Sequence, residues 1–147
     1  MYIKIMIPNR YLSGLSRKDR RTQKKNILKS RSAYKTNKLK RYVPRPKLRS
    51  FKQKKSSWTQ TFHELYPGVT KIKDISKVTG IPKNALLAVK KKGMGAYYSS
   101  GSRPNQTAQS WGLGRMYSYI LGGKTRGVDH EITRKYKVRF KHRLKIK

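Results

Sequence analysis

Few residues of this sequence are placed so that they could act together in catalysis or in binding a metal. Asp129-His130-Glu131 is the one local cluster of titratable side chains that suits catalysis. Its alternate carboxylates could share one face of a strand and bind a hard cation, as in a metal-dependent nuclease, because hard cations prefer oxygen ligands. The same carboxylates could instead pair with Arg126 or Arg134. Two carboxylates are few for a metal site, so we expect no enzyme activity, no metal, no cofactor and no small-molecule substrate.

A loop rich in glycine and serine is the second feature with chemical potential. Residues 93–107 combine these small residues with paired tyrosines, and Arg103 precedes the start of an expected helix. Backbone amides in such a loop could cradle a phosphate. The spacing completes neither a P-loop motif nor a GxGxxG motif. We therefore favour a structural loop over a phosphate site.

Positive charge is the dominant chemical feature of the chain. The 147 residues hold 39 Lys and Arg against five Asp and Glu, which gives a formal net charge of +34. Self-repulsion on this scale opposes compaction, so we expect the chain to bind a polyanion or an acidic protein surface. Residues 10–55 hold 19 of the cations and residues 132–147 hold eight. This distribution predicts a basic N-terminal arm over 1–55, a small central domain over 56–131 and a basic C-terminal strand over 132–147.

Composition limits the compartment as well. No apolar run approaches the roughly 20 residues that span a bilayer, so we expect no transmembrane helix. Met1–Ile7 is too short for a signal peptide and is followed by Pro8. The chain has no cysteine, which excludes disulfides and suits a reducing compartment.

The basic N-terminal arm has little sustained apolar periodicity. Ser16 could cap a helix over Arg17–Arg31, with Asp19 at the favourable third position. Pro44 and Pro46 then force an extended stretch, because proline fixes its own φ and pushes its predecessor out of the helical region. Lone apolar residues between cations are typical of a segment that threads between subunits or lies on phosphates. We expect a long, mainly extended arm.

The first clearly ordered segment predicted within the central domain is a helical hairpin over Ile72–Gly93. Gly80 makes the turn, Pro82 begins the second helix and Gly93 stops it. The spacing resembles a DNA-binding helix-turn-helix, in which Lys83, Asn84 and Leu87 would point into a major groove. A hairpin packed into a core needs the same apolar spacing, and we favour that structural interpretation.

A second helix is predicted over Ala108–Leu121, ended by Gly122-Gly123. Gly112 and Gly114 lower its intrinsic stability, so we expect them to pack closely against another backbone.

The C-terminal segment Lys135–Lys147 alternates cationic and mostly apolar residues without a break. A period of two predicts a β-strand with one apolar and one cationic face. Met1–Ile7 is also β-prone and could pair with it. His142 lies on the apolar face, where ring packing or a partner contact is expected. The predicted fold class is therefore α+β, with a small, mainly helical central domain, a long extended basic N-terminal arm and a C-terminal β-strand.

Several segments carry a family resemblance. The run Lys92–Lys124, with its Gly-Ala-Tyr-Tyr-Ser-Ser-Gly-Ser-Arg-Pro-Asn-Gln-Thr sequence, resembles an uncharacterised domain family of large algal DNA viruses (the chloroviruses and their relatives) and of some tailed phages. Tyr11–Asp19 and Arg45–Lys52 are similar to the same group, so the resemblance covers roughly residues 11–130. It implies a virus-encoded protein packaged in the particle, and it brings no catalytic residues.

Three functions are open at this stage. We expect a minor capsid protein of a large double-stranded DNA virus, located in the virion and bound to the capsid lattice through its basic arms. Its expected partners are capsid proteins of the same particle, and packaged DNA or an anionic inner membrane besides. The alternatives are a virus-encoded protein that binds and condenses DNA, and an RNA-binding protein of the ribosomal type.

The expected binding residues follow from the charge and from the C-terminal pattern. The cations expected to contact the polyanion or partner are Arg17, Lys18, Arg20, Arg21, Lys24, Lys25, Arg31, Arg45, Lys47, Arg49, Lys52, Lys54, Lys55, Lys90, Lys91, Lys92, Arg103, Lys135, Lys137, Arg139, Lys141, Arg143 and Lys145. The expected apolar anchors are Tyr136, Val138, Phe140, Leu144 and Ile146.

Overall fold

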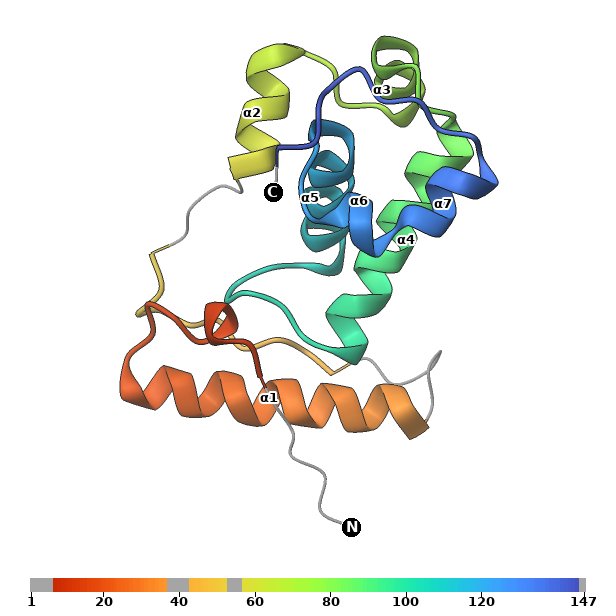
Figure 1. The fold of residues 1–147 in the computed structure, drawn as a ribbon. Helices are drawn as coiled ribbons and strands as arrows, with labels where there is room; N and C mark the ends of the chain where they lie inside the picture. The colour runs from red at the N-terminus through yellow and green to blue at the C-terminus, as the bar shows by residue number, and fades with distance from the viewer. Residues whose placement is uncertain (1–6, 37–42, 53–56, 146–147) are drawn as a thin grey trace. The chain divides into compact units, whose positions relative to one another are not determined.

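The computed structural model describes residues 7–36, 43–52 and 57–145, and these parts of the chain taken together are mainly helical (Figure 1). Their elements in chain order are η1 (Asn9–Tyr11), α1 (Arg17–Thr36), α2 (Ser57–Leu65), α3 (Ile72–Thr79), α4 (Lys83–Ser99), α5 (Ala108–Leu121), α6 (Thr125–Val128) and α7 (His130–Lys135). None of the described helices is long and apolar enough to cross a bilayer.

The α+β prediction is wrong, because the described residues contain no β-strand. Where a C-terminal strand was expected, α7 continues to Lys135, and Lys137 then takes a left-handed φ of 51°. The chain beyond it runs as an irregular segment past α3 toward α2 (Figure 1). Burial still alternates there, with Val138 buried and Arg139 exposed. Alternation of apolar and cationic residues indicates only that every second side chain faces the core, and a segment can alternate in this way without pairing with a strand. The pairing expected for Met1–Ile7 falls mainly on residues outside the described ranges.

The long extended N-terminal arm is also a wrong prediction, because α1 occupies 20 residues of it. The predicted helix start is confirmed: the Asp19 amide donates to the Ser16 hydroxyl at 3.2 Å. The helix extends beyond Arg31 and ends at Thr36. The stretch that contains Pro44 and Pro46 is non-helical, as those residues predict.

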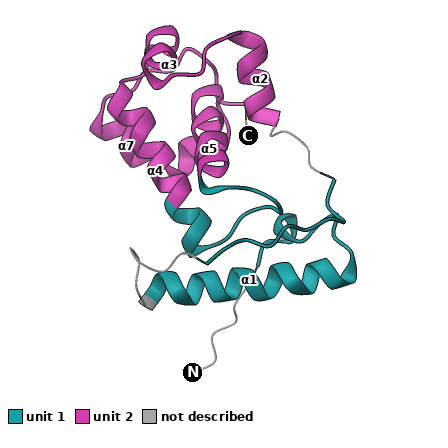
Figure 2. Cartoon of the chain, turned by 180° about the vertical axis from the view of Figure 1, so that it is seen from behind, with its two compact units in different colours: residues 1–54, 95–108 teal, residues 55–94, 109–147 magenta. Residues whose placement is uncertain are grey.

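The chain forms two compact units (Figure 2). Unit 1 contains residues 1–54 and 95–108, and unit 2 contains residues 55–94 and 109–147. The loop segment 95–108, which we expected in the central domain, therefore groups with the N-terminal segment.

Unit 2 is built around a continuous apolar core. Its buried members are Phe62, Ile75, Ile81, Ala85, Leu86, Val89, Met116, Tyr117, Tyr119, Ile120, Leu121, Ile132 and Val138. The hairpin turn at Gly80 and the helix Ala108–Leu121 are confirmed.

The predicted stop at Gly93 is wrong, because α4 continues to Ser99. Gly93 instead marks a close approach between helices: a Cβ there would lie 2.8 Å from the Gly112 Cα. A Cβ on Gly112 would lie 2.8 Å from the Lys90 carbonyl oxygen. The close packing expected of Gly112 is thus confirmed.

Candidate functional site

The largest group of exposed cations in unit 1 lies on α1. One stripe of this helix is buried, with Gln23, Ile27 and Ser30 at 4%, 0% and 3% exposure. These positions are three or four residues apart, so they share one face of the helix. The rest of the helix surface is exposed, with Arg20 beside this stripe and Arg17, Lys18, Arg21, Lys24, Lys25, Lys29 and Lys35 across the broad opposite side. We call these eight residues the α1 cationic face.

Polar side chains on the inner stripe hold α1 to the loop of the same unit. The Gln23 amide donates to the carbonyls of Tyr11 and Ser102 at 3.3 and 3.2 Å. The Ser30 hydroxyl donates to the Tyr98 carbonyl at 3.0 Å. These bonds satisfy loop carbonyls that are partly or fully removed from water, and they fix the direction in which the α1 cationic face points.

Two cations of the predicted set point inward. Arg31 donates twice to the Ser100 carbonyl, at 2.9 and 2.8 Å. Arg45 donates to Asn26 Oδ1 at 2.9 Å and to the Tyr97 carbonyl, and its guanidinium lies 4.4 Å from the centre of the Tyr97 ring. Both residues are half-buried, and their bonds to the Ser100 and Tyr97 carbonyls hold the end of α4 and the following loop in place.

Asn105 closes the other end of this loop. Its side chain accepts the Leu48 amide at 2.9 Å and donates to the Leu48 carbonyl at 3.0 Å. Its φ of 58° lies in the left-handed region, which asparagine tolerates better than most residues. Asn105 thereby fixes the segment 43–52 to the loop at a second point, in addition to the bond from Arg45 to the Tyr97 carbonyl.

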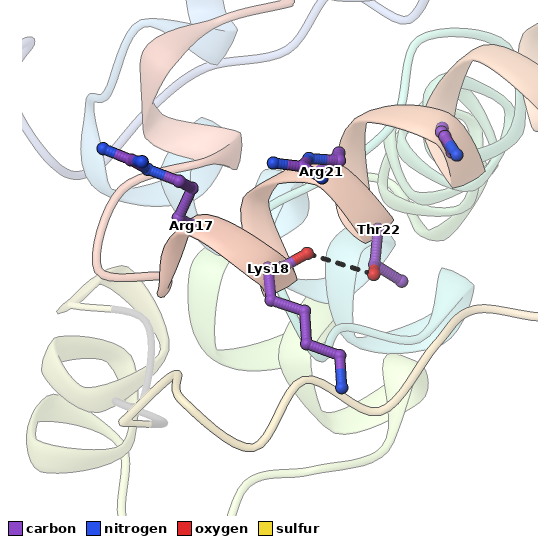
Figure 3. A pocket seen from close by; sticks show the side chains of 5 residues that line it. Arg17, Lys18, Arg21 and Thr22 are labelled. Carbon is purple, nitrogen blue, oxygen red and sulfur yellow. Dashed lines mark hydrogen bonds between the residues drawn. The ribbon is translucent and has the colours of Figure 1, made fainter.

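The surface of α1 is hollowed between its own cations. Arg17, Lys18, Arg21, Thr22 and Lys25 line an open hollow of about 380 Å³. Figure 3 shows Lys18 and Thr22 one turn apart, with the Thr22 hydroxyl donating back to the Lys18 carbonyl at 3.1 Å. The hydroxyl is therefore occupied, and the hollow offers ammonium and guanidinium groups to a ligand.

The acid of α1 does not neutralise this face. The Asp19 carboxylate accepts the hydroxyl and the backbone amide of Ser50, which lower its pKa below the usual value, with a smaller contribution from Lys18. Asp19 is therefore held as a carboxylate by the segment 43–52, on the edge of the buried stripe.

The other predicted cations are spread over the surface. Lys47, Arg49, Lys52, Lys91, Lys92, Arg103, Lys135, Lys137, Arg139, Lys141, Arg143 and Lys145 are exposed, and Lys90 is half-buried. Lys141 donates to the Val78 carbonyl at 2.9 Å, and Lys92 lies 3.9 Å from Asp129. Lys54, Lys55 and Ile146 lie outside the described residues.

The predicted apolar anchors mostly pack within unit 2. Val138 belongs to its buried core, and Tyr136 and Phe140 pack partly buried against that core. The Phe140 ring lies edge-on to Tyr119 at 5.0 Å, and the Arg126 guanidinium lies 3.7 Å from its centre. Leu144 is 59% exposed. The ring packing expected of His142 is confirmed: its ring lies edge-on to the Tyr66 ring, with the centroids 5.9 Å apart, and its Nε2 lies 2.8 Å from the Tyr66 hydroxyl.

The acidic cluster near the C-terminus is used structurally. Asp129 is fully buried and forms a two-point ion pair with Arg115, at 2.9 and 2.6 Å. The expected partner Arg126 instead donates to the carbonyls of Tyr119 and Ile120, at the end of α5. In the described part of the chain, no three His, Asp or Glu side chains gather as metal ligands. Arg115 was not predicted, since its partner lies 14 residues away and no local motif joins them.

The segments that carried the family resemblance meet in unit 1. Tyr11–Asp19, Arg45–Lys52 and residues 95–108, which comprise the end of α4 and the loop after it, are joined there by the bonds of Gln23, Arg45 and Asn105. The chain belongs to the family of unknown function DUF5824, whose sequence model matches residues 8–137. No curated protein and no solved structure matches the chain.

Proposed function

We propose that this protein binds nucleic acid along its phosphate backbone through the α1 cationic face. The observation that carries the proposal is the separation of charges on α1: eight exposed cations on one broad face, with Asp19 bonded to Ser50 at the edge of the buried stripe. A helix of 20 residues is about 30 Å long, so this face is long enough to follow several successive phosphates.

The face suits phosphates better than lipid or an apolar protein groove. An interfacial helix needs a wide apolar face opposite its charges. The apolar residue Ile27 is buried inside unit 1, and the exposed side of α1 carries one large aliphatic side chain among its cations, Leu28, which is 36% exposed. The face consists almost wholly of long, flexible cations, which bind phosphates of any sequence. The expected binding is therefore strong, salt-dependent and indifferent to sequence.

A structural role in a virus particle is a second proposal. The resemblance to algal-virus and phage proteins supports it, and so does one exposed apolar side chain, Leu144, between the exposed cations Arg143 and Lys145. In that setting the protein is a minor capsid component, with Leu144 placed against a capsid partner and the α1 cationic face turned to packaged DNA, an acidic capsid surface or an anionic inner membrane.

Charge-removal variants test the first proposal. We would measure binding of the full chain to duplex DNA and to single-stranded RNA by fluorescence anisotropy, between about 50 and 200 mM salt. Replacing Arg17, Arg21 and Lys25 with Gln should flatten the log–log salt slope by about 2.7 on duplex DNA, since each lost phosphate contact removes about 0.9. The matched control replaces Arg134, Lys137 and Arg139 with Gln, which removes the same charge from the C-terminal segment. Equal losses in both variants would show that charge acts without a defined site and would refute the proposal.

The virion proposal is tested on particles. Particles emptied of DNA and washed at about 1 M salt, where the Debye length is near 3 Å, should keep the protein if an apolar contact holds it. Release together with the DNA would refute the lattice role. It would leave the nucleic-acid proposal standing.

A further inference from the structure

The α3–α4 hairpin of unit 2 is fixed by a short turn of three residues between Thr79 and Lys83. Gly80 has a left-handed φ of 73°, and its amide donates to the Ser76 carbonyl at 2.9 Å. The Ser76 hydroxyl donates to the Ile81 carbonyl at 2.6 Å, and the Thr79 hydroxyl accepts the Ile81 amide at 3.3 Å. Side chains and backbone thus close the turn from both sides, and the angle between the two helices is set.

The inward positions of the hairpin are all filled. Ile75 and Thr79 before the turn are 0% and 1% exposed. Ile81 after it is 1% exposed, and Leu86 and Val89 on the second helix are both 0% exposed. Two helices joined by a three-residue turn with glycine at its first position have the layout of the helix-turn-helix motif. The apolar side chains that such a motif packs between its helices, here Ile75, Ile81, Leu86 and Val89, are all buried.

The outward face of the second helix carries a different set. Lys83, Asn84, Leu87 and Lys91 are exposed, at spacings that place them on one side of α4. Lys83 and Asn84 are the first two residues of α4. The N-terminal residues of a recognition helix are those that contact base edges in this motif.

The chemistry of these side chains matches the major groove. An asparagine amide can bond adenine N6 and N7 at once, a lysine can donate to guanine O6 and N7, and an alkyl group can contact the thymine methyl. Leu87 is 40% exposed between Lys83 and Lys91. An apolar side chain between cations is disfavoured in water and suits a thymine methyl between phosphates.

The first helix supplies charge where such a motif crosses the DNA backbone. Lys71, Lys73 and Lys77 are exposed on or beside α3, together with one acid, Asp74. Lys141 adds a further cation at the C-terminal end of α3, where it donates to the Val78 carbonyl. The hairpin surface is therefore positive overall, which complements duplex phosphates.

We propose that the N-terminal half of α4 enters the major groove of duplex DNA and distinguishes bases with Lys83, Asn84 and Leu87. Lys91 and the α3 lysines contact the flanking phosphates. This inference goes beyond backbone binding by α1, because it assigns sequence preference to a second surface, on the other unit. The two proposals can fail independently.

Selection from a pool of random duplexes tests the inference with the full chain. Wild-type protein should enrich a short motif, and binding to that motif should exceed binding to a scrambled duplex. Asn84→Ala should lower the preference for one base pair by about 5- to 160-fold, the range for losing one two-point base contact. Its affinity for the scrambled duplex and its salt slope should stay unchanged. Asn84 is exposed, so the variant keeps its core, which circular dichroism verifies.

A matched variant separates the two surfaces. Arg17, Arg21 and Lys25 changed together to Gln should weaken binding to both duplexes and keep their ratio. Failure to enrich any motif would overturn the inference, as would an unchanged motif with Asn84→Ala. Preferential binding of single-stranded nucleic acid or of a protein by the hairpin, lost in Lys83→Ala, would also overturn it. None of these outcomes would alter the salt-slope test of α1.

Discussion

Ser50 donates its hydroxyl and its backbone amide to the same oxygen of Asp19, at 2.5 and 3.0 Å. The Ser50 hydroxyl oxygen also accepts the Ser16 amide at 3.0 Å. One serine of the segment 43–52 thus bonds both the residue before α1 and the acid in its first turn. The start of the cationic helix is therefore tied to a segment more than thirty residues away.

This pair predicts a pH dependence. Bonds from Ser50 lower the pKa of Asp19, so the carboxylate form is favoured in the folded state. A depressed folded-state pKa gives stability that is present above the unfolded value, about 3.9, and is lost as the pH falls through the folded-state pKa. NMR titration should find the Asp19 pKa below its usual value, and Ser50→Ala should raise it. An unchanged Asp19 pKa in Ser50→Ala would contradict the prediction.

The contact between α4 and α5 predicts that alanine substitutions at two glycines of α4 change the free energy of unfolding in opposite directions. Gly93→Ala places a Cβ 2.8 Å from the Gly112 Cα, and overpacking of this kind costs about 1–3 kcal/mol in the free energy of unfolding. Gly95→Ala is the control, since nothing lies within 4 Å of its added Cβ. Alanine there should raise the stability by about 0.5–1 kcal/mol, because it favours the helix. Urea denaturation measures both, and equal effects would argue against the close crossing.

The buried ion pair between Arg115 and Asp129 predicts a large loss from a small change. Asp129→Asn leaves the Arg115 guanidinium without its carboxylate, and breaking a buried pair costs about 3–5 kcal/mol. Glu131→Gln removes the same charge two residues along, at an exposed position, and should change the stability by less than about 0.5 kcal/mol. Thermal unfolding of the two variants compares them directly. A similar Tm for both would show that the ion pair is not formed in solution.

The left-handed φ of Asn105, together with its two bonds to Leu48, predicts different stabilities for two substitutions at this position. Asn105→Ala loses both bonds to Leu48. It also places alanine, which lacks the polar side chain that lets asparagine adopt this conformation, at a φ of 58°. Asn105→Gly loses the same bonds and tolerates that φ. The alanine variant should therefore be less stable than the glycine variant by about 1–2 kcal/mol, the cost of the left-handed region. Equal unfolding free energies would place Asn105 in another conformation.

The sequence predicts this fold best where the signal is local. Ser16 with Asp19, Gly80 and Gly122 each mark a helix boundary through their own conformational chemistry, and those boundaries are where they were expected. Gly93 misleads, because glycine serves equally as a helix terminator and as the space that a second backbone needs. Only Gly112, nineteen residues on, decides between the two roles.

The candidate site could also be predicted only where it depends on local sequence. The composition of α1 indicates an exposed cationic face, since a helix this charged has room for only a narrow buried stripe. Composition cannot separate Arg31 and Arg45 from their neighbours, because each binds a carbonyl more than fifty residues away. The alternation after Lys135 shows the same limit, since it gives the buried side of the segment without naming what covers it.

The discontinuity of unit 1 has a consequence for anyone who shortens this chain. Residues 95–108 lie in sequence between two parts of unit 2, yet their carbonyls bond to Gln23, Ser30 and Arg31. The basic N-terminal segment is therefore not a detachable tail. A fragment that starts after residue 55 would keep the loop and lose its bonds to Gln23, Ser30, Arg31, Arg45 and Leu48, exposing Tyr97 and its neighbouring backbone to water. A domain boundary placed near residue 55, where the density of positive charge falls, would separate residues 95–108 from the rest of unit 1.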